Sequence, residues 1–167
     1  MRYHDILKDD MRNGDGLRVV LFVAGCEHKC KGCHNPVTWD VNGGLKFDAD
    51  ALLEICDELE KEWVSGITLS GGDPLHPKNR EDVTVLCKCL KKSYPDKTIW
   101  MYTGYDYDEV AGLEVMKYVD VLVDGKFVEE LADVTYPWAG SRNQTVRKVW
   151  FYLTDAPDGS KAIVRKA

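Results

Sequence analysis

Three cysteines stand close together in the stretch GCEHKCKGCHNP, residues 25–36. Cys26, Cys30 and Cys33 have the spacing C-x3-C-x2-C. Thiolates hold iron–sulfur clusters, and a 4Fe–4S cubane uses four of them when every iron has a protein ligand. Three thiolates leave one iron open, and an open coordination position is typical of metal sites that perform chemistry. The pattern therefore favours a reactive cluster held by three cysteines.

A zinc site is the alternative, with His28 or His34 as the fourth ligand. Paired zinc knuckles have a second C-x2-C or H-x3-H farther along the chain, and this sequence has neither. Cys87 and Cys89 lie two residues apart in a predicted helix, where their side chains point to different sides. We expect these two, together with Cys56, to be ordinary buried or half-buried thiols.

A second chemical feature is the turn SGGDP, residues 70–74. Gly71 and Gly72 would expose backbone N–H and C=O groups to a ligand, and Asp73 would offer a negative acceptor to an ammonium group. Alone, the motif predicts only a tight turn. Beside the cysteine loop it becomes a candidate grip for an amino-acid group.

The elements that must position these loops alternate between strand and helix, which predicts βαβ units and a mainly parallel sheet. The cysteine loop, SGGDP, TGY and DGKF each follow a predicted strand, so we expect them to meet at the carboxyl edge of the sheet. The chain after Asp155 looks loose. The predicted strands are Leu17–Ala24, Ile67–Leu69, Thr98–Tyr102, Val119–Val123 and Thr145–Leu153, and the predicted helices are Asp48–Trp63, with Asp48 or Asp50 as N-cap, Arg80–Lys92 and Asp106–Tyr118.

Composition limits the classes of function. The 167 residues suit one domain, with 44% hydrophobic and 30% charged residues and a formal net charge of −6. We find no basic run, so a nucleic-acid partner is not expected. The start lacks the apolar region of a signal peptide, and no apolar run approaches the roughly 20 residues that span a bilayer. We therefore expect neither secretion nor membrane insertion, but a reducing cytoplasm.

Taken together, the motifs resemble those of the radical S-adenosylmethionine enzymes. The closer resemblance is to the activating proteins of anaerobic ribonucleoside-triphosphate reductase, a glycyl-radical enzyme. The similarity extends over about residues 13–144. The matching segments, in family order, are NGDGLRVVLFVAGCEHKCKGCHNPVTW, SGGDPLHPKN, IWMYTGY, VDVLVDGKFV and GSRNQ.

The resemblance implies a fold, a set of cofactors and site residues. The fold would be an α/β partial, open (βα) barrel, with residues 1–167 as one domain. Cys26, Cys30 and Cys33 would ligate a 4Fe–4S cluster and act in catalysis through it, while S-adenosylmethionine occupies the fourth iron. Gly71, Gly72 and Asp73 would hold the methionine end of S-adenosylmethionine, and Gly32, Cys33 and His34 would lie near its adenosine.

The resemblance also implies an activity and partners. Reductive cleavage of S-adenosylmethionine would give a 5′-deoxyadenosyl radical, which takes hydrogen from a glycine of the large reductase subunit. A low-potential electron donor such as flavodoxin and a homodimer are the other expected partners. The alternatives are an activase of another glycyl-radical enzyme, such as pyruvate formate-lyase, and a zinc-stabilised binding module.

Some residues depart from the family pattern or have two interpretations. Ala139 and Arg142 stand where the resemblance predicts an arginine and a serine, although Gly140, Ser141, Asn143 and Gln144 fit it. We expect any effect of the two departures in partner docking. Four residues have more than one interpretation: they line the cavity, meet the incoming glycine loop of the partner, or are structural residues of the rim. They are Arg18, Tyr102, Thr103 and Asp124.

Overall fold

The protein is described from a computed structural model that covers residues 1–149 in full and the backbone of residues 151–155 and 161–165. Ten larger elements and three 3-10 turns precede the terminal hairpin. Along the chain they are β1 (Arg2–Asp10), β2 (Leu17–Val23), η1 (Pro36–Trp39), β3 (Leu45–Lys46), α1 (Ala49–Leu59), β4 (Val64–Gly71), α2 (Arg80–Ser93), β5 (Thr98–Tyr102), α3 (Tyr107–Val110), η2 (Glu114–Lys117), β6 (Val121–Asp124), η3 (Glu129–Leu131) and β7 (Thr145–Lys148), followed by β8 (Phe151–Asp155) and β9 (Lys161–Arg165).

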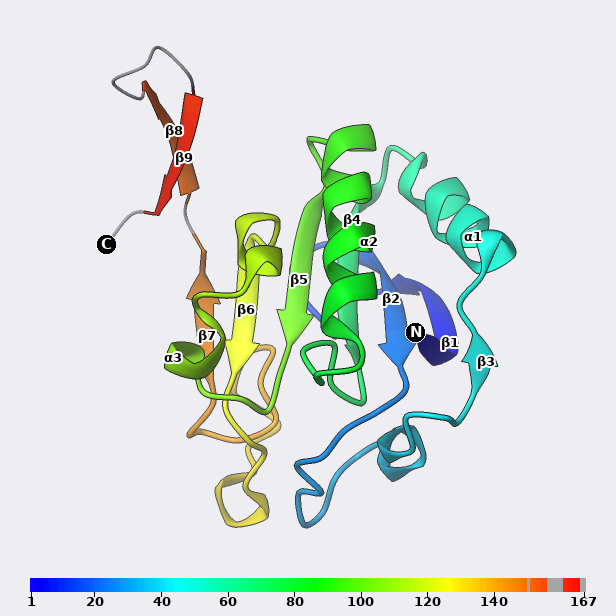
Figure 1. Ribbon diagram of the computed structural model, residues 1–167. Helices are drawn as coiled ribbons and strands as arrows, with labels where there is room; N and C mark the ends of the chain where they lie inside the picture. The colour runs from blue at the N-terminus through cyan, green and yellow to red at the C-terminus, as the bar shows by residue number, and fades with distance from the viewer. Residues whose placement is uncertain (150, 156–160, 166–167) are drawn as a thin grey trace.

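One seven-stranded sheet organises the molecule, with the strand order β3-β1-β2-β4-β5-β6-β7 (Figure 1). The four central strands, β2, β4, β5 and β6, run parallel. Their carboxyl ends point to the bottom of Figure 1, where the loops that follow them gather. The predicted meeting of these loops at one edge is confirmed.

The expected partial, open (βα) barrel is wrong. A βα barrel is built of parallel strands, whereas here β1 and β3 at one edge and β7 at the other pair antiparallel with their neighbours. The result is an open, mixed α/β sheet. The predicted strand–helix alternation describes its centre correctly, but it predicts neither β1 and β3 nor the antiparallel direction of β7. β1 carries two register shifts, and such irregularity removes the regular alternation by which a strand is predicted.

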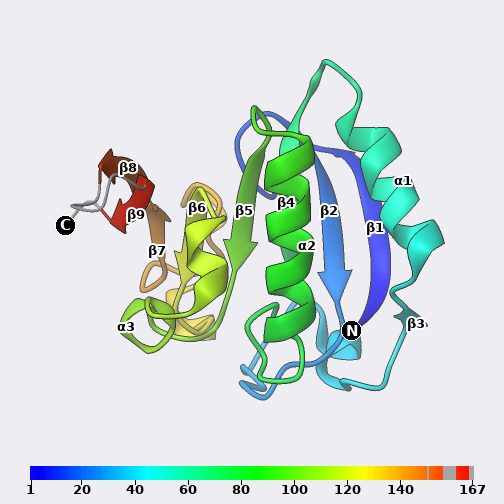
Figure 2. The same ribbon diagram turned by 45° about the horizontal axis from the view of Figure 1, so that its top comes forward.

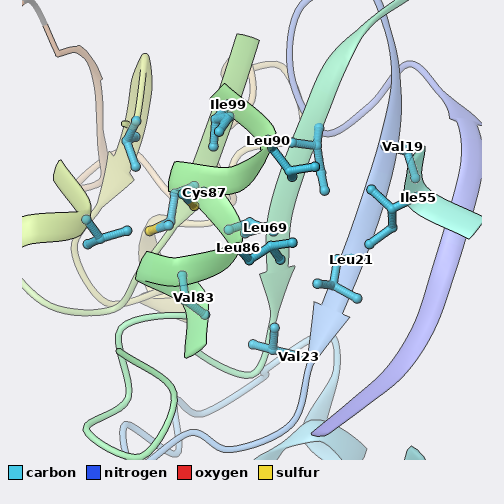
Figure 3. Close-up of a cluster of buried hydrophobic side chains, with 14 of the residues drawn as sticks. Val19, Leu21, Val23, Ile55, Leu69, Val83, Leu86, Cys87, Leu90 and Ile99 are labelled. Atoms are coloured by element: carbon cyan, nitrogen blue, oxygen red, sulfur yellow. The ribbon is translucent and has the colours of Figure 1, made fainter. Parts of the chain in front are cut away.

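The two long helices lie on the same face of the sheet (Figure 2). α2 contributes Val83, Leu86 and Leu90 to the core, and α1 contributes Ile55 and Leu59. Figure 3 shows Val83, Leu86 and Leu90 of α2 and Ile55 of α1 beside labelled side chains of β2, β4 and β5. Cys87 belongs to the same core, and burial raises the pKa of its thiol to about 12. The hydrophobic face of each helix therefore fixes the central strands.

Most predicted helices and strands are confirmed, with shifted ends. Asp48 is the N-cap of α1, because its carboxylate accepts a hydrogen bond from the Ala51 N–H at 3.2 Å. The predicted helix Asp106–Tyr118 is wrong: it is divided into α3 and η2. Gly112 lies at the break, and glycine is costly inside a helix and common just past its end.

The end of the chain differs from its prediction. The single strand expected at Thr145–Leu153 is two strands, β7 in the main sheet and β8 in a separate two-stranded sheet. β9 pairs antiparallel with β8, so the prediction of a loose segment is wrong for residues 161–165. Residues 150, 156–160 and 166–167 lie outside the described residues.

In the part of the chain that the structure describes, no helix is long and apolar enough to cross a bilayer.

Leu69 at the centre of β4 provides a test of the packing. The side chain is fully buried, so Leu69→Ala should lower the free energy of unfolding by about 2–5 kcal/mol, through lost burial and a residual cavity. Leu53 of α1, which is 59% exposed, is the matched control, and Leu53→Ala should change it by no more than about 0.5 kcal/mol. Urea titrations measure both; equal losses would contradict the described core.

Candidate functional site

A cavity of about 780 Å³ is lined by the loops that follow the four parallel strands. Phe22, Ser70 and Tyr102 also line it, from β2, β4 and β5. Their neighbours Leu21 and Leu69 belong to the core against the helices, and successive side chains of a strand point to opposite faces. The cavity therefore extends onto the face of the sheet opposite α1 and α2.

The three cysteines of the C-x3-C-x2-C motif lie together in the wall of this cavity. The loop that carries them begins directly after β2, and three of its residues have positive φ: Gly25 at 105°, Lys29 at 48° and Gly32 at 69°. Backbone hydrogen bonds hold its first part, because Cys26 N–H donates to the Trp39 carbonyl at 3.1 Å. Burial raises the pKa of the Cys26 thiol above its ordinary value. In the metal-free protein this thiol is therefore protonated at neutral pH.

The predicted glycine turn packs directly against the cysteine loop. Gly72 N–H donates to the Val23 carbonyl at 2.8 Å, and Asp73 N–H donates to the Gly25 carbonyl at 2.7 Å. A Cβ atom on Gly72 would lie 2.5 Å from the Gly25 carbonyl oxygen and 2.8 Å from that of Thr38. Only glycine permits this approach of the two loops without a backbone shift.

Asp73 is buried, with 1% of its surface exposed. The Leu75 N–H donates to Oδ1 at 2.8 Å, the Gly104 N–H donates to Oδ2 at 2.9 Å, and the Thr103 hydroxyl lies 3.0 Å from both oxygens. His28 Nε2 lies 2.8 Å from Oδ2. One carboxylate thus connects the loops that follow β2, β4 and β5.

The remaining predicted contact residues lie at the opposite side of the cysteine loop. His34 is exposed, with its ring 5.1 Å from that of Phe127. Gly32 packs on Glu129, whose Oε1 would lie 2.7 Å from an added Cβ. Lys31 forms an ion pair with the same Glu129 at 2.9 Å. The end of the cysteine loop is therefore adjacent to the segment that follows β6.

The residues around the cysteines suit a cluster larger than one ion. In the described part of the chain, no three cysteine, histidine or acidic side chains converge on a single ion-sized position. A cubane holds its cysteines at separate iron corners and does not require such convergence. Trp39 also lines the cavity, and its indole N–H is buried without an acceptor among the described residues. A cluster sulfur would supply the acceptor that this donor lacks.

The structure distinguishes cavity-lining from structural roles for the four residues that had more than one interpretation. Tyr102 and Thr103 line the cavity, and burial raises the pKa of the Tyr102 hydroxyl. Arg18 is structural: it is fully buried, and its Nη2 donates to the carbonyls of Ile67 and Thr98 at 2.7 and 2.8 Å. Asp124 is structural too, and accepts from Arg147 Nε at 2.8 Å.

The other three cysteines lie outside the cavity lining. Cys56 is half-buried and Cys87 buried, as predicted, whereas the prediction is wrong for Cys89, which is exposed. Cys87 and Cys89 lie on different sides of α2, as helical spacing requires.

No sequence pattern predicts a site role for Trp39 or Gly104 individually, and the sequence predicts His28 only as a possible zinc ligand. A signal for His28 was its place midway between Cys26 and Cys30. Its contact with Asp73 joins residues 45 positions apart, so no local pattern predicts it.

Known proteins resemble this chain over most of its length. The family described as a 4Fe-4S single cluster domain matches residues 12–147. The anaerobic ribonucleoside-triphosphate reductase-activating protein of Enterobacteria phage T4 is 45% identical over 144 residues, which are 86% of this chain and 92% of that protein. The proteins of the same name from Escherichia coli (strain K12) and Haemophilus influenzae are 45% and 42% identical, over 87% and 89% of this chain and 97% and 98% of their own lengths. The chain belongs to the family of anaerobic ribonucleoside-triphosphate reductase-activating proteins.

The family match confirms the predicted resemblance and the predicted 4Fe–4S cluster domain. It also decides against the zinc-stabilised binding module, since the matching family is defined by an iron–sulfur cluster.

Gly72 tests whether the close approach of the two loops maintains the cluster site. Gly72→Ala introduces a Cβ against two backbone oxygens, so the loops must separate, at a cost of about 1–3 kcal/mol. We expect less iron and inorganic sulfide per chain after anaerobic reconstitution. The control is Gly112→Ala, because an added Cβ there has no atom within 4 Å. Equal iron content in the two variants would contradict the role of this contact.

Proposed function

We propose that this protein activates an anaerobic ribonucleoside-triphosphate reductase by generating the glycyl radical of its large subunit. The observation that carries the proposal is the cavity shared by the three cysteines and the Gly71–Gly72 turn. Relatives at 42–45% identity bear the name of activating proteins of that reductase. Residues 1–167 would work as one radical S-adenosylmethionine domain.

Cys26, Cys30 and Cys33 would hold the 4Fe–4S cluster in the cavity wall. A bound, reduced cluster would supply one electron for the cleavage of S-adenosylmethionine to methionine and a 5′-deoxyadenosyl radical, and that radical would take a hydrogen atom from the partner's glycine. The cysteine thiols lose their protons on binding iron, and because burial raises the pKa of Cys26, this thiol would release a proton when it binds the metal at neutral pH.

The rest of the cavity would orient S-adenosylmethionine. Gly71, Gly72 and Asp73 would lie at its methionine end, supported by the exposed backbone of the turn beside the cysteines. Gly32, Cys33 and His34 would lie near the adenosine, and the exposed ring of His34, 5.1 Å from that of Phe127, is available to contact a flat ring. These groups bind and orient; none of them transfers a proton in the proposed reaction.

The far wall of the cavity would receive the reductase. Residues 133–140 line it, and Trp138 stacks edge-to-face on Trp100 with ring centroids 5.1 Å apart. Arg142, one of the two departures from the family pattern, forms an ion pair with Asp133 at 2.5 Å, and its own side chain is 68% exposed. Ala139 lines the cavity, and its small side chain would leave more room for a glycine-bearing loop than the arginine that the resemblance predicts there.

The proposal also includes an electron donor, protein assembly and a cellular compartment. A low-potential protein such as flavodoxin would donate the electron, the activase would associate with the reductase subunit and with a second copy of itself, and both would work in the cytoplasm. The family resemblance supports these assignments.

Cys30 tests the ligand assignment. Cys30→Ala should abolish reductive cleavage of S-adenosylmethionine, because one corner of the cluster loses its ligand. The products to measure under anaerobic conditions are 5′-deoxyadenosine and methionine. Cys89→Ala, which changes an exposed thiol of α2 outside the cavity lining, is the control and should retain cleavage. Cleavage by Cys30→Ala at the control rate would show that Cys30 is not a ligand.

The partner is tested by mixing the reconstituted protein with a candidate large subunit, S-adenosylmethionine and reductant. Spin resonance should detect a glycyl radical in anaerobic ribonucleoside-triphosphate reductase. Pyruvate formate-lyase, treated identically, should remain without a radical. A radical in pyruvate formate-lyase alone would contradict the proposed partner.

A further inference from the structure

We infer that His28 is a positioning residue for the reaction centre: its hydrogen bond to Asp73 fixes the cysteine loop in the orientation that binds S-adenosylmethionine. The inference rests on the proposed function for its chemical consequence. It goes beyond that function by giving roles to two side chains that neither ligate the cluster nor react.

The other partners of Asp73 indicate the direction of this contact. The ring nitrogen Nε2 of His28 lies 2.8 Å from Oδ2 of Asp73, and the two side chains are 6% and 1% exposed. Each oxygen of Asp73 already accepts from a backbone N–H, so we assign the carboxylate as the acceptor and Nε2 as the donor. That nitrogen is therefore engaged by protein and is not directed at a metal.

Asp73 fixes the cysteine loop at two points. Its backbone N–H donates to the carbonyl of Gly25, directly before Cys26, and its carboxylate accepts from His28, midway between Cys26 and Cys30. These two hydrogen bonds hold the chain before and after Cys26 against the end of β4. We therefore expect loss of the His28 hydrogen bond to alter the direction of the Cys26 side chain.

The His28 ring is held from two further sides. It packs edge-to-face on Tyr105, with ring centroids 4.5 Å apart, and a Cβ on Gly104 would overlap it. Tyr105 in turn donates its hydroxyl to Glu27 of the same cysteine loop. The ring is therefore a spacer as well as a donor, and the two properties are separable by substitution.

The carboxylate of Asp73 is already occupied within the protein. Two backbone N–H groups, the Thr103 hydroxyl and His28 share its two oxygens. Its contribution at the methionine end is therefore indirect, through the loops it holds. When His28 loses its donor, the other three groups still satisfy Asp73, so the fold should persist.

Two variants separate the donor from the ring. His28→Phe keeps an aromatic ring against Tyr105 and removes the N–H, whereas His28→Gln restores an N–H donor of similar reach. His76→Gln is the matched control, since His76 lies in the neighbouring loop, its Nδ1 accepts from the Lys78 N–H at 3.3 Å, and it is not among the residues that line the cavity. The apparent Kd for S-adenosylmethionine is measured from the change it causes in the spin-resonance spectrum of the reduced cluster.

We expect His28→Phe to raise this Kd at least about tenfold, the usual cost of losing a partner that orients a metal ligand. His28→Gln should stay within about threefold of the wild type, and the urea unfolding midpoints of all variants should agree. Unchanged affinity in His28→Phe would overturn the inference. Equal loss of iron in both His28 variants would also overturn it. Glutamine restores the N–H donor but not the imidazole, so that result would indicate that His28 binds the cluster as a ligand.

A second measurement is independent of the cluster. In the reduced, metal-free protein, Cys26 is half-buried, and His28→Phe should increase its rate of alkylation several-fold while His28→Gln and His76→Gln leave the rate unchanged. An unchanged rate in His28→Phe contradicts the positioning role. A wild-type protein that binds no iron contradicts the proposed function, and the alkylation rates still decide the inference.

Discussion

The backbone contact between the loops after β2 and β4 is the constraint on which the site depends. The two strands pair in parallel, with Val23 opposite Gly71, so both end at the same level. Gly72 then lies against Gly25 at a distance that excludes a side chain, and Asp73 donates back to the Gly25 carbonyl. Strand register thus brings a cysteine loop and a glycine turn together, although more than 40 residues separate them in sequence.

The two faces of the sheet have different functions: one packs against helices, and the other carries the cavity. α1 and α2 cover one face and hold the central strands through a continuous apolar core. The other face has no long helix against it among the described residues, and it carries the cavity. A protein substrate requires such access, because its glycine must come close to the bound cofactors. The stability of one face therefore permits the openness of the other.

The sequence predicted the parts of the structure that local chemistry determines. The cysteine spacing, the Gly71–Gly72 turn and the amphipathic patterns of α1 and α2 are local, and each is found where it was predicted. The edge strands β1 and β3 were not predictable, because β1 is irregular and β3 has only two residues. The link from His28 to Asp73, and the Trp39 indole that has no acceptor in the described part of the chain, depend on tertiary contacts that no sequence periodicity predicts.

The central claim is that the polypeptide leaves one iron of the cluster without a ligand, so that S-adenosylmethionine binds there. Mössbauer spectroscopy of protein reconstituted with the iron-57 isotope tests it most directly. The account predicts that adding S-adenosylmethionine shifts the signal of a single iron site and leaves the others unchanged. A spectrum that S-adenosylmethionine does not alter, or one in which every iron already has a protein ligand, would contradict it.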